Sequence, residues 1–183
     1  MKVSPEEAWS ILNSADVVCS ATEVLAAVDR MAADITAALS QRLPLVLSVM
    51  RGSVIFAGHL LPRLRFPLDF DYLDVTRYGN ETSGGEITWK VSPGTAVAGR
   101  VVLVVDDILD EGHTLAAVRD KLMTAGALEV HSAVFAEKDT GRVKPLRAEF
   151  TGIMVPNRYV FGFGMDVKGA WRNLPAVYAL RDS

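Results

Sequence analysis

Residues 101–114 read VVLVVDDILDEGHT, a β-branched hydrophobic run followed by three aspartates and a glycine. Such a run is typical of a central strand of a parallel sheet, because both of its faces are buried. Open α/β sheets bind ligands at the carboxyl ends of such strands. The carboxylates can accept hydrogen bonds from sugar hydroxyls or hold hydrated Mg²⁺, and Gly112 lets backbone N–H groups curl around a phosphate. The alternative is a solvated acidic turn in which Asp110 caps the following helix.

The segments on either side of this run alternate between strand and helix patterns. Short apolar stretches bounded by loops predict strands at 45–50, 68–76, 86–91, 100–105 and 130–136, and helices at 54–61 and 114–125. Residues 80–85 form a polar loop that we expect to be exposed. This alternation predicts an α/β fold with a largely parallel central sheet and helices on both faces.

Two further helices are predicted within residues 1–43. Ser4 and Ser20 each have a glutamate three residues later, the spacing of a capping box at a helix N-terminus. Hydrophobic residues recur every three or four positions from Val24 to Leu39, and Pro44 ends the second helix. We therefore expect both helices to pack against the domain and to take no part in its chemistry.

The composition indicates one globular domain over residues 1–183. The chain has 19 basic and 22 acidic residues, a net charge of −3, and half of its residues are hydrophobic. This hydrophobic content excludes intrinsic disorder, and the lack of a basic excess argues against nucleic-acid binding. The single cysteine, Cys19, excludes an internal disulfide and a cysteine-rich zinc site. Because we find no signal peptide and no apolar run of about 20 residues, we expect a cytoplasmic protein outside membranes.

Residues 101–114 resemble the phosphoribosyl-pyrophosphate-binding signature of the type I phosphoribosyltransferases, in which a hydrophobic strand leads into two acids and an Asp-x-Gly-x-Thr loop. Three further segments are similar to the hypoxanthine-guanine branch of that family: 49–56 (VMRGSVIF), 136–140 (AEKDT), and 157–166 (NRYVFGFGMD) with 171–175 (WRNLP). Their order and spacing match along residues 45–180, about three quarters of the chain. Four ordered motifs are far more specific than one.

The resemblance implies the type I phosphoribosyltransferase fold, with N-terminal helices in 1–43, a core in 45–155 and a small purine-binding hood in 156–183. The implied reaction transfers 5-phosphoribosyl from phosphoribosyl pyrophosphate to N9 of hypoxanthine or guanine, yielding IMP or GMP and pyrophosphate. The implied cofactor is Mg²⁺, and the implied assembly is a homodimer or homotetramer. Two alternatives stay open: a preference for xanthine, and a regulatory protein of this fold that senses nucleotides or binds RNA.

The resemblance also assigns roles to the residues of the acidic segment. Asp106 and Asp107 match the acidic pair that contacts the ribose hydroxyls, directly or through Mg²⁺. Asp110 matches the acid/base that shares a proton with purine N7. The 5-phosphate is expected in a loop made by Glu111, Gly112, His113 and Thr114, and Asp110 is also assigned to the phosphoribosyl-pyrophosphate site. Many relatives carry Thr and Lys where this chain has Glu111 and His113, so these two side chains depart from the family pattern.

The pyrophosphate site is implied by two other segments. The pyrophosphate loop matches Met50-Arg51-Gly52, and we expect a non-proline cis peptide between Met50 and Arg51. Arg172 matches a second pyrophosphate ligand, and Asp166 matches a carboxylate near the metal. Without the neighbouring motifs, an ordinary strand-ending turn would explain Arg51, and a surface ion pair would explain Arg172 and Asp166. The metal ligands implied by the resemblance are Asp106, Asp107 and Asp166.

The purine site and a closing lid are implied by the remaining motif residues. Lys138 matches the lysine that donates to the 6-oxo group of the purine, an interaction that opposes the 6-amino group of adenine. Tyr159 is expected to stack on the purine, with the Val160 backbone at the ring edge and Asp166 close by. Arg77-Tyr78 resembles the start of the family's flexible lid, although an ordinary hairpin loop would explain this segment equally.

Overall fold

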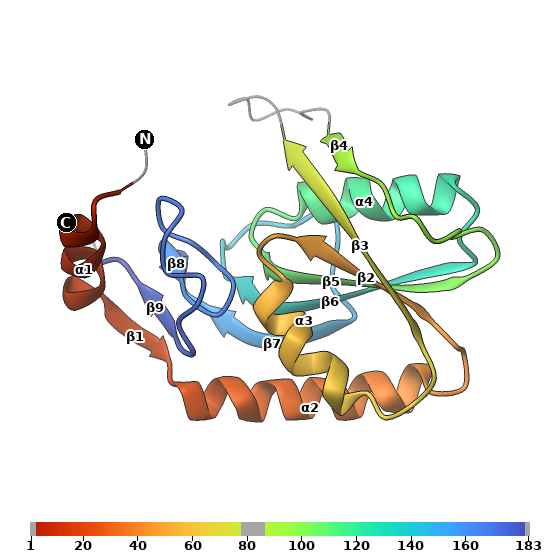
Figure 1. The fold of residues 1–183 in the computed structure, drawn as a ribbon, viewed down its shortest axis with the longest axis horizontal. Coiled ribbons are helices and arrows are strands. Elements are labelled where there is room, and N and C mark those ends of the chain that lie inside the picture. Colours follow the sequence, from red (N-terminus) through yellow and green to blue (C-terminus); the bar gives the residue numbers. More distant parts are fainter. Residues whose placement is uncertain (1–2, 78–86, 182–183) are drawn as a thin grey trace.

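The computed structural model describes residues 3–77 and 87–181, which form a sheet-centred body with a smaller lobe at one end (Figure 1). The elements follow one another along the chain as α1 (Pro5–Ser14), β1 (Asp16–Cys19), α2 (Ala21–Leu39), β2 (Leu45–Met50), α3 (Val54–Leu60), η1 (Leu61–Arg63), β3 (Asp69–Arg77), β4 (Ile87–Val91), β5 (Val101–Leu109), α4 (His113–Thr124), β6 (Glu129–Lys138), β7 (Phe150–Val155), β8 (Val160–Phe161) and β9 (Val177–Ala179).

The body is built on a six-stranded sheet in the order β4-β3-β2-β5-β6-β7. Neighbouring strands from β3 to β7 pair in parallel, whereas β4 is antiparallel to β3. This arrangement confirms the predicted α/β fold with a largely parallel sheet. β5 lies between β2 and β6, and residues 101–105 are at most 5% exposed, which explains the unbroken hydrophobic run.

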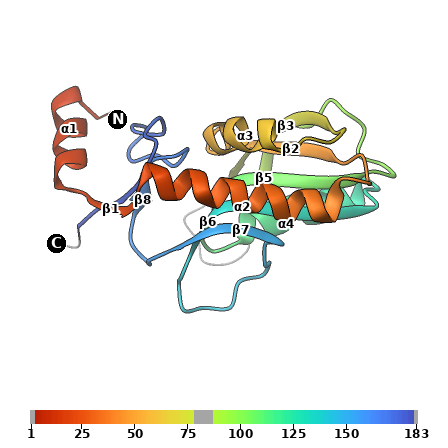
Figure 2. The same ribbon diagram turned by 90° about the horizontal axis from the view of Figure 1, so that it is seen from below.

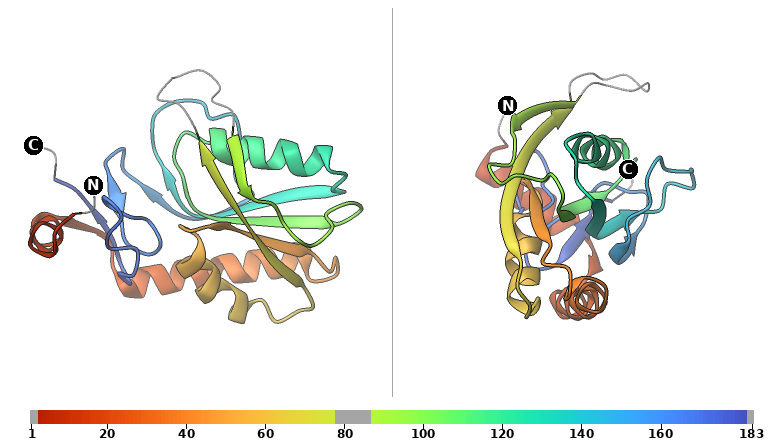
Figure 3. Two further views of the ribbon diagram at one scale, coloured as in Figure 1. Left: turned by 45° about the horizontal axis from the view of Figure 1, so that its top comes forward. Right: turned by 90° about the vertical axis from the view of Figure 1, so that its right-hand side faces the viewer.

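Successive residues of the central strands contribute to two hydrophobic layers, because side chains alternate between the faces of a sheet. Leu103 and Val105 of β5 belong to the layer that contains the buried residues of α2 and α3. Val102 and Val104 belong to the layer that contains the buried residues of α4. Figure 3 shows α2 and α4 on opposite faces of the sheet. The predicted apolar stripe of α2 is buried along its length, so this helix packs as expected.

β5 is longer than the sequence pattern predicts. The expected strand ends at Val105, but parallel pairing with β6 continues through Asp106, opposite Val134, to Leu109, opposite Glu137. Asp106 and Asp107 therefore lie within the strand, and the turn begins only at Asp110. The continued ladder satisfies backbone groups that a turn at Asp106 would have left to other partners.

The smaller lobe is a three-stranded sheet in the order β1-β9-β8, and we call it the hood. β1 pairs antiparallel with β9, so the N-terminal segment supplies one of its strands. The sequence predicted only helices within residues 1–43, and thus β1 was missed. Four residues between two helices carry too little alternation to reveal a strand whose partner lies more than 150 positions away.

Both N-terminal helices begin after the predicted serine cap, but only the second has the full predicted capping box, and the two helices differ in packing. Ser20 and Glu23 form a full capping box, whereas Ser4 accepts a hydrogen bond from the Glu7 backbone. α1 has no buried residue, and Figure 2 shows it beyond the hood, away from the central sheet.

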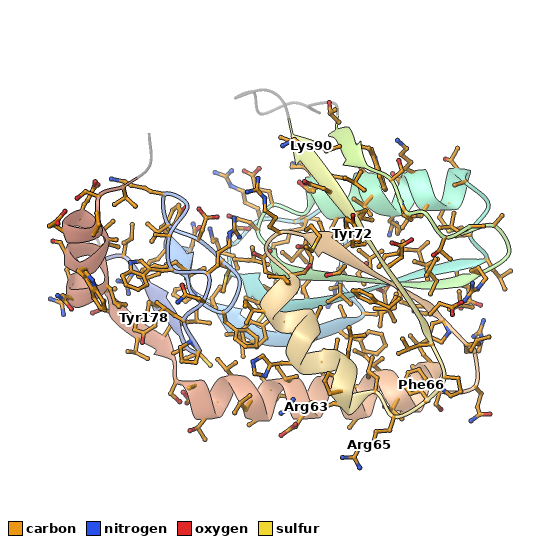
Figure 4. All side chains as sticks on the ribbon, viewed as in Figure 1. Arg63, Arg65, Phe66, Tyr72, Lys90 and Tyr178 are labelled. Carbon is orange, nitrogen blue, oxygen red and sulfur yellow. The ribbon has the colours of Figure 1, made fainter. Side chains whose placement is uncertain are left out.

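Arg63 of η1 pairs with Asp29 of α2, and Figure 4 shows Arg63 beside this helix. Within residues 3–77 and 87–181, no helix is long and apolar enough to cross a membrane.

Gly152 of β7 marks a close approach between strands and helix α2. A Cβ atom at this position would lie 2.5 Å from the Phe135 carbonyl oxygen and 2.9 Å from Met31 Sδ. We expect Gly152→Ala to lower the free energy of unfolding by about 1–3 kcal/mol, the usual cost of overpacking a core. The matched control is Gly58→Ala in α3, which has no neighbour within 4 Å and should raise stability by about 0.5–1 kcal/mol. Urea denaturation measures both, and equal shifts would contradict the packing argument.

Candidate active site

A cavity of about 500 Å³ opens at the carboxyl ends of β5 and β6. Its wall contains Asp106 from β5, Lys138 from β6, the loop that leads into α4, and Asn157 from the hood connection. The parallel sheet therefore brings together the acidic segment and the lysine that the sequence assigned to one site. Asn157 has no predicted role, although it lies inside one of the quoted motifs.

The loop before α4 has the geometry of an anion-binding turn. Gly112 is the N-cap of α4 with φ +85°, a left-handed conformation that favours glycine, and α4 has no side-chain cap. The first N–H groups of a helix lack partners within it, and the helix dipole adds partial positive charge there. Glu111 and His113 are exposed, and Thr114 is partly buried beside the same cavity. Because Gly112 is the cap, the alternative in which Asp110 caps this helix is wrong.

Asp110 instead forms an ion pair with Lys138 across the mouth of the cavity. Lys138 Nζ donates to Asp110 Oδ2 over 2.5 Å, and the side chains are 13% and 48% exposed respectively. Lys138 is thus not a solvated surface lysine. One donor group and one acceptor group stand side by side, each at the end of a neighbouring strand.

Burial raises the pKa of both carboxyls in the acidic pair. For Asp106 the negative charge of Asp107 raises the pKa further. For Asp107, hydrogen bonding with Asp106 and the positive charge of Arg172, 3.9 Å away, oppose the effect of burial on its pKa. Each carboxylate also accepts a hydrogen bond from the next backbone N–H, at 2.9 Å. Two partly buried carboxylates at a strand end form a site that favours cations and hydroxyl donors.

The loop after β2 packs directly against this acidic pair. The Met50–Arg51 peptide is cis, as predicted. A Cβ atom on Gly52 would lie 2.0 Å from Asp107 Oδ2, so only glycine fits at this contact. A Cβ atom on Gly164 of the hood would in turn lie 2.1 Å from the Gly52 carbonyl oxygen. The predicted pyrophosphate loop, the acidic strand and the hood therefore meet at Asp107.

Asp166 and Arg172 form an ion pair in the hood beside this junction. Arg172 also donates to the Gly164 carbonyl oxygen at 2.6 Å, and the second carboxylate oxygen of Asp166 accepts from the Gly169 N–H at 2.7 Å. Asp166 is thus engaged by hood groups. In the part of the chain that the structure describes, no three His, Cys, Asp or Glu residues gather as a metal site, so the implied trio with Asp106 and Asp107 is not assembled.

Tyr159 and Val160, the residues predicted at the purine site, differ in exposure. Tyr159 is 52% exposed and its hydroxyl donates to the Asp166 carbonyl oxygen at 3.1 Å, which rules out a core aromatic. Val160 is buried in β8. Of the implied lid, Arg77 is the last residue of β3 and pairs with Ile87 of β4, while Tyr78 lies outside the described residues.

Lys144 is a second residue near the cavity that the sequence analysis missed. It lies between β6 and β7 and contacts the ends of both β5 and β6. No pattern in the sequence indicates this, because a lysine in a polar loop is usually solvated. Only the fold brings its side chain to the strands that carry Asp110 and Lys138.

Comparison with known proteins places the chain among phosphoribosyltransferases. Residues 18–168 match the family model described as phosphoribosyl transferase domain. The chain is 31% identical over 166 residues to the hypoxanthine-guanine phosphoribosyltransferase of Bacillus subtilis, covering 90% of this chain and 92% of that protein. A hypoxanthine-guanine phosphoribosyltransferase structure from Bacillus anthracis has a TM-score of 0.86 at 26% identity, with 91% and 98% of the chains covered.

A second kind of relative is a longer protein. The chain is 34% identical over 166 residues to the bifunctional protein TilS/HprT of Listeria innocua, and this match covers 90% of the chain. It covers 26% of the relative, so the chain spans about a quarter of the length of that protein.

The raised pKa of Asp106 predicts how its replacement changes stability. Aspartates of the unfolded chain titrate near about 3.9, so the folded chain holds the Asp106 proton more tightly. This contribution to stability is fully present below the unfolded pKa and is lost as pH rises through the raised folded pKa. Asp106→Asn removes the titration. We expect its free energy of unfolding to exceed that of the unmodified chain at pH 7 and to depend less on pH.

Guanidinium denaturation between about pH 5 and pH 8, without metal or substrate, measures this difference. The control is Asp120→Asn on the exposed surface of α4, which should leave the pH dependence unchanged. A loss of stability in Asp106→Asn at pH 7 would show that the buried carboxylate is compensated by its surroundings.

Proposed function

The chain belongs to the phosphoribosyl transferase family, and from this premise we propose that it is a purine-salvage enzyme. It transfers 5-phosphoribosyl from phosphoribosyl pyrophosphate to N9 of hypoxanthine or guanine, giving IMP or GMP and pyrophosphate. The observation that carries the proposal is the Lys138–Asp110 pair at the mouth of the cavity. This pair presents one donor for a 6-oxo group and one carboxylate for a proton on the neighbouring ring nitrogen.

Phosphoribosyl pyrophosphate lies along the carboxyl ends of β2 and β5 in this proposal. The 5-phosphate occupies the turn at Gly112, where the N-terminus of α4 and the Thr114 hydroxyl supply donors. The ribose hydroxyls donate to Asp106 and Asp107. The pyrophosphate group lies between the loop at Gly52 and the Arg172 guanidinium, which is close to Asp107.

The acidic pair fits the magnesium ion that this family of reactions implies. Asp106 and Asp107 offer carboxylate oxygens, the ligands that Mg²⁺ prefers, and this ion usually takes one or two protein carboxylates together with substrate oxygens. A small protein ligand set therefore suits it, and Asp166 stays with Arg172. When bound, Mg²⁺ neutralises charge on the pyrophosphate as it leaves.

The reaction needs groups that stabilise the charge developing at C1 and on the leaving group, and a group that accepts a proton from the purine. N9 of the purine attacks C1, the C1–O bond to pyrophosphate breaks, and the N7 proton passes to Asp110. Arg172 and the backbone N–H groups near Gly52 stabilise the charge that develops on pyrophosphate. Lys138 holds the 6-oxo group, and exposed Tyr159 stacks on the purine ring beside the Val160 backbone.

Several finer expectations belong to the same proposal. Arg77 and Tyr78 begin a lid that excludes water from the ribosyl cation. The assembly is a homodimer or homotetramer, which sedimentation would measure, and neither nucleic acid nor membrane is a partner. The location is the cytoplasm, where the free and buried thiol of Cys19 stays reduced. Two alternative functions are a preference for xanthine as the base and a regulatory role in nucleotide sensing without turnover.

The deciding experiment supplies the protein with Mg²⁺, phosphoribosyl pyrophosphate and one base at a time. Hypoxanthine, guanine, xanthine and adenine are compared by chromatography of the nucleotide and by release of pyrophosphate. We expect nucleotide from hypoxanthine and guanine. Binding of phosphoribosyl pyrophosphate without any product would favour the regulatory alternative instead.

Asp110→Asn should reduce turnover far more than it reduces affinity for phosphoribosyl pyrophosphate. The amide keeps the size of the side chain but cannot accept the N7 proton, and general acid/base groups contribute about 10²–10⁴-fold to rates. Pre-steady-state measurement of the chemical step tests this, with Asp120→Asn on the surface of α4 as the control. An unchanged rate for that step would remove Asp110 from the acid/base role.

Lys138→Ala should weaken the use of 6-oxopurines and leave binding of phosphoribosyl pyrophosphate nearly intact. An ammonium group has only donors, so it suits a carbonyl oxygen and opposes the amino group of adenine. A mispaired buried polar group costs about 1–3 kcal/mol, so kcat/KM for hypoxanthine should fall at least tenfold. Lys121→Ala, remote on α4, is the matched control. Equal use of adenine and hypoxanthine by the unmodified protein would contradict this role.

A further inference from the structure

Lys144 uses all of its hydrogen-bonding capacity at the edge of the cavity. Its side chain is 9% exposed. Its Nζ donates to the Leu109 carbonyl oxygen at 3.1 Å, to the Lys138 carbonyl oxygen at 2.7 Å and to Glu137 Oε1 at 3.2 Å. An ammonium group has three protons, and here each one has an acceptor. This buried lysine is therefore fixed by its neighbours and cannot swing out to solvent without losing all three contacts.

The two carbonyl acceptors lie at the ends of neighbouring strands. Leu109 is the last residue of β5 and precedes Asp110, while Lys138 is the last residue of β6. The β5–β6 ladder closes with the pair Leu109 and Glu137. Lys144 therefore continues the connection between the strands at the point where the backbone ladder stops.

We propose that Lys144 is a positioning residue that sets the distance between Asp110 and Lys138. By bridging the Leu109 and Lys138 carbonyl oxygens, it holds the two strand ends at the spacing that lets both side chains meet one purine. This role rests on the proposed function, in which Asp110 and Lys138 contact the base. Misplacing a group in a site by 1 Å can cost about 10²-fold in rate, so a bridge at this point has a large effect.

The packing of the phosphate turn supports the same role. A Cβ atom at Gly112 would lie 3.5 Å from Lys144 Cβ and 3.4 Å from Pro145 Cδ, so the segment 144–145 backs the turn before α4. The ion pair with Glu137 offers a different reading, in which Lys144 only adds stability. The two roles use different contacts, because the carbonyl bridge does not need the charge of Glu137.

Two substitutions separate the bridge from the ion pair. Lys144→Met keeps the length and apolar stem of the side chain but removes the ammonium group. We expect the KM for hypoxanthine to rise about tenfold or more and kcat to fall as well, because the strand ends are no longer held. Glu137→Gln keeps the carbonyl bridge and should change either constant by less than about threefold. Calorimetric titration with phosphoribosyl pyrophosphate and Mg²⁺ shows whether each variant is folded and binds.

A double-mutant cycle with Lys138→Ala gives a readout that a general loss of stability would not produce. If Lys144 acts on purine binding through Lys138, adding Lys144→Met to Lys138→Ala should raise the KM for hypoxanthine by less than about threefold. Fully additive effects would overturn the proposal, and so would an unchanged KM and kcat in Lys144→Met alone. If Lys144→Met does not fold, Lys144→Gln, which keeps a donor for one carbonyl, takes its place with the same expectations.

An activity assay of the unmodified protein separates failure of the proposed function from failure of the positioning role of Lys144. If it forms no nucleotide from any 6-oxopurine, the proposed function fails and the role of Lys144 fails with it. If it is active and Lys144→Met has unchanged constants, only the positioning role is overturned.

Discussion

Close packing of glycine backbone around the Asp107 side chain is the constraint on which the rest of the site depends. The loop at Gly52 approaches the Asp107 carboxylate, and the hood approaches Gly52 at Gly164, at distances that leave no room for a Cβ atom. The loop after β2 is thereby packed against the Asp107 side chain on one side and against the hood backbone on the other. In the proposed function this loop, the end of β5 and the hood hold pyrophosphate, ribose and purine. Their relative positions then depend on rigid contacts, which is the condition for precise placement of reacting atoms.

The charges around this junction are arranged so that most carboxylates have a cation of the protein beside them. Asp110 pairs with Lys138, Glu137 with Lys144 and Asp166 with Arg172. Asp106 is different: across residues 3–77 and 87–181 it has no ion pair with a lysine or arginine, and burial raises its pKa. A carboxylate with a backbone hydrogen bond but no cation beside it favours the binding of a cation or a hydroxyl donor. Asp106 is therefore the carboxylate of the site that gains most from the proposed ligand.

Local sequence patterns predicted the elements whose burial follows from the pattern of hydrophobic residues within a single segment. The β-branched run of β5 and the apolar stripe of α2 each indicate burial without reference to a partner. β1 and Lys144 could not be found in this way, because their partners are strands far away in the sequence. The extension of β5 to Leu109 has the same cause, since pairing with β6 decides it. Family resemblance predicted a set of site residues, whereas the ion pair between Asp166 and Arg172 is a contact that only the fold shows.

The pairing of Lys138 with Asp110 bears on selectivity beyond the lysine alone. The two groups present a donor beside an acceptor, fixed by adjacent strand ends. A 6-oxopurine protonated at N7 offers the reverse order, an acceptor at O6 beside a donor at N7, so both contacts can form together. Adenine offers a donor at its 6-amino group, which faces the ammonium, and this mismatch cannot be relieved by moving Lys138 without also breaking its contact with Asp110. In the proposed function, discrimination therefore belongs to the pair, and the geometry that joins the two strand ends contributes to the choice of base.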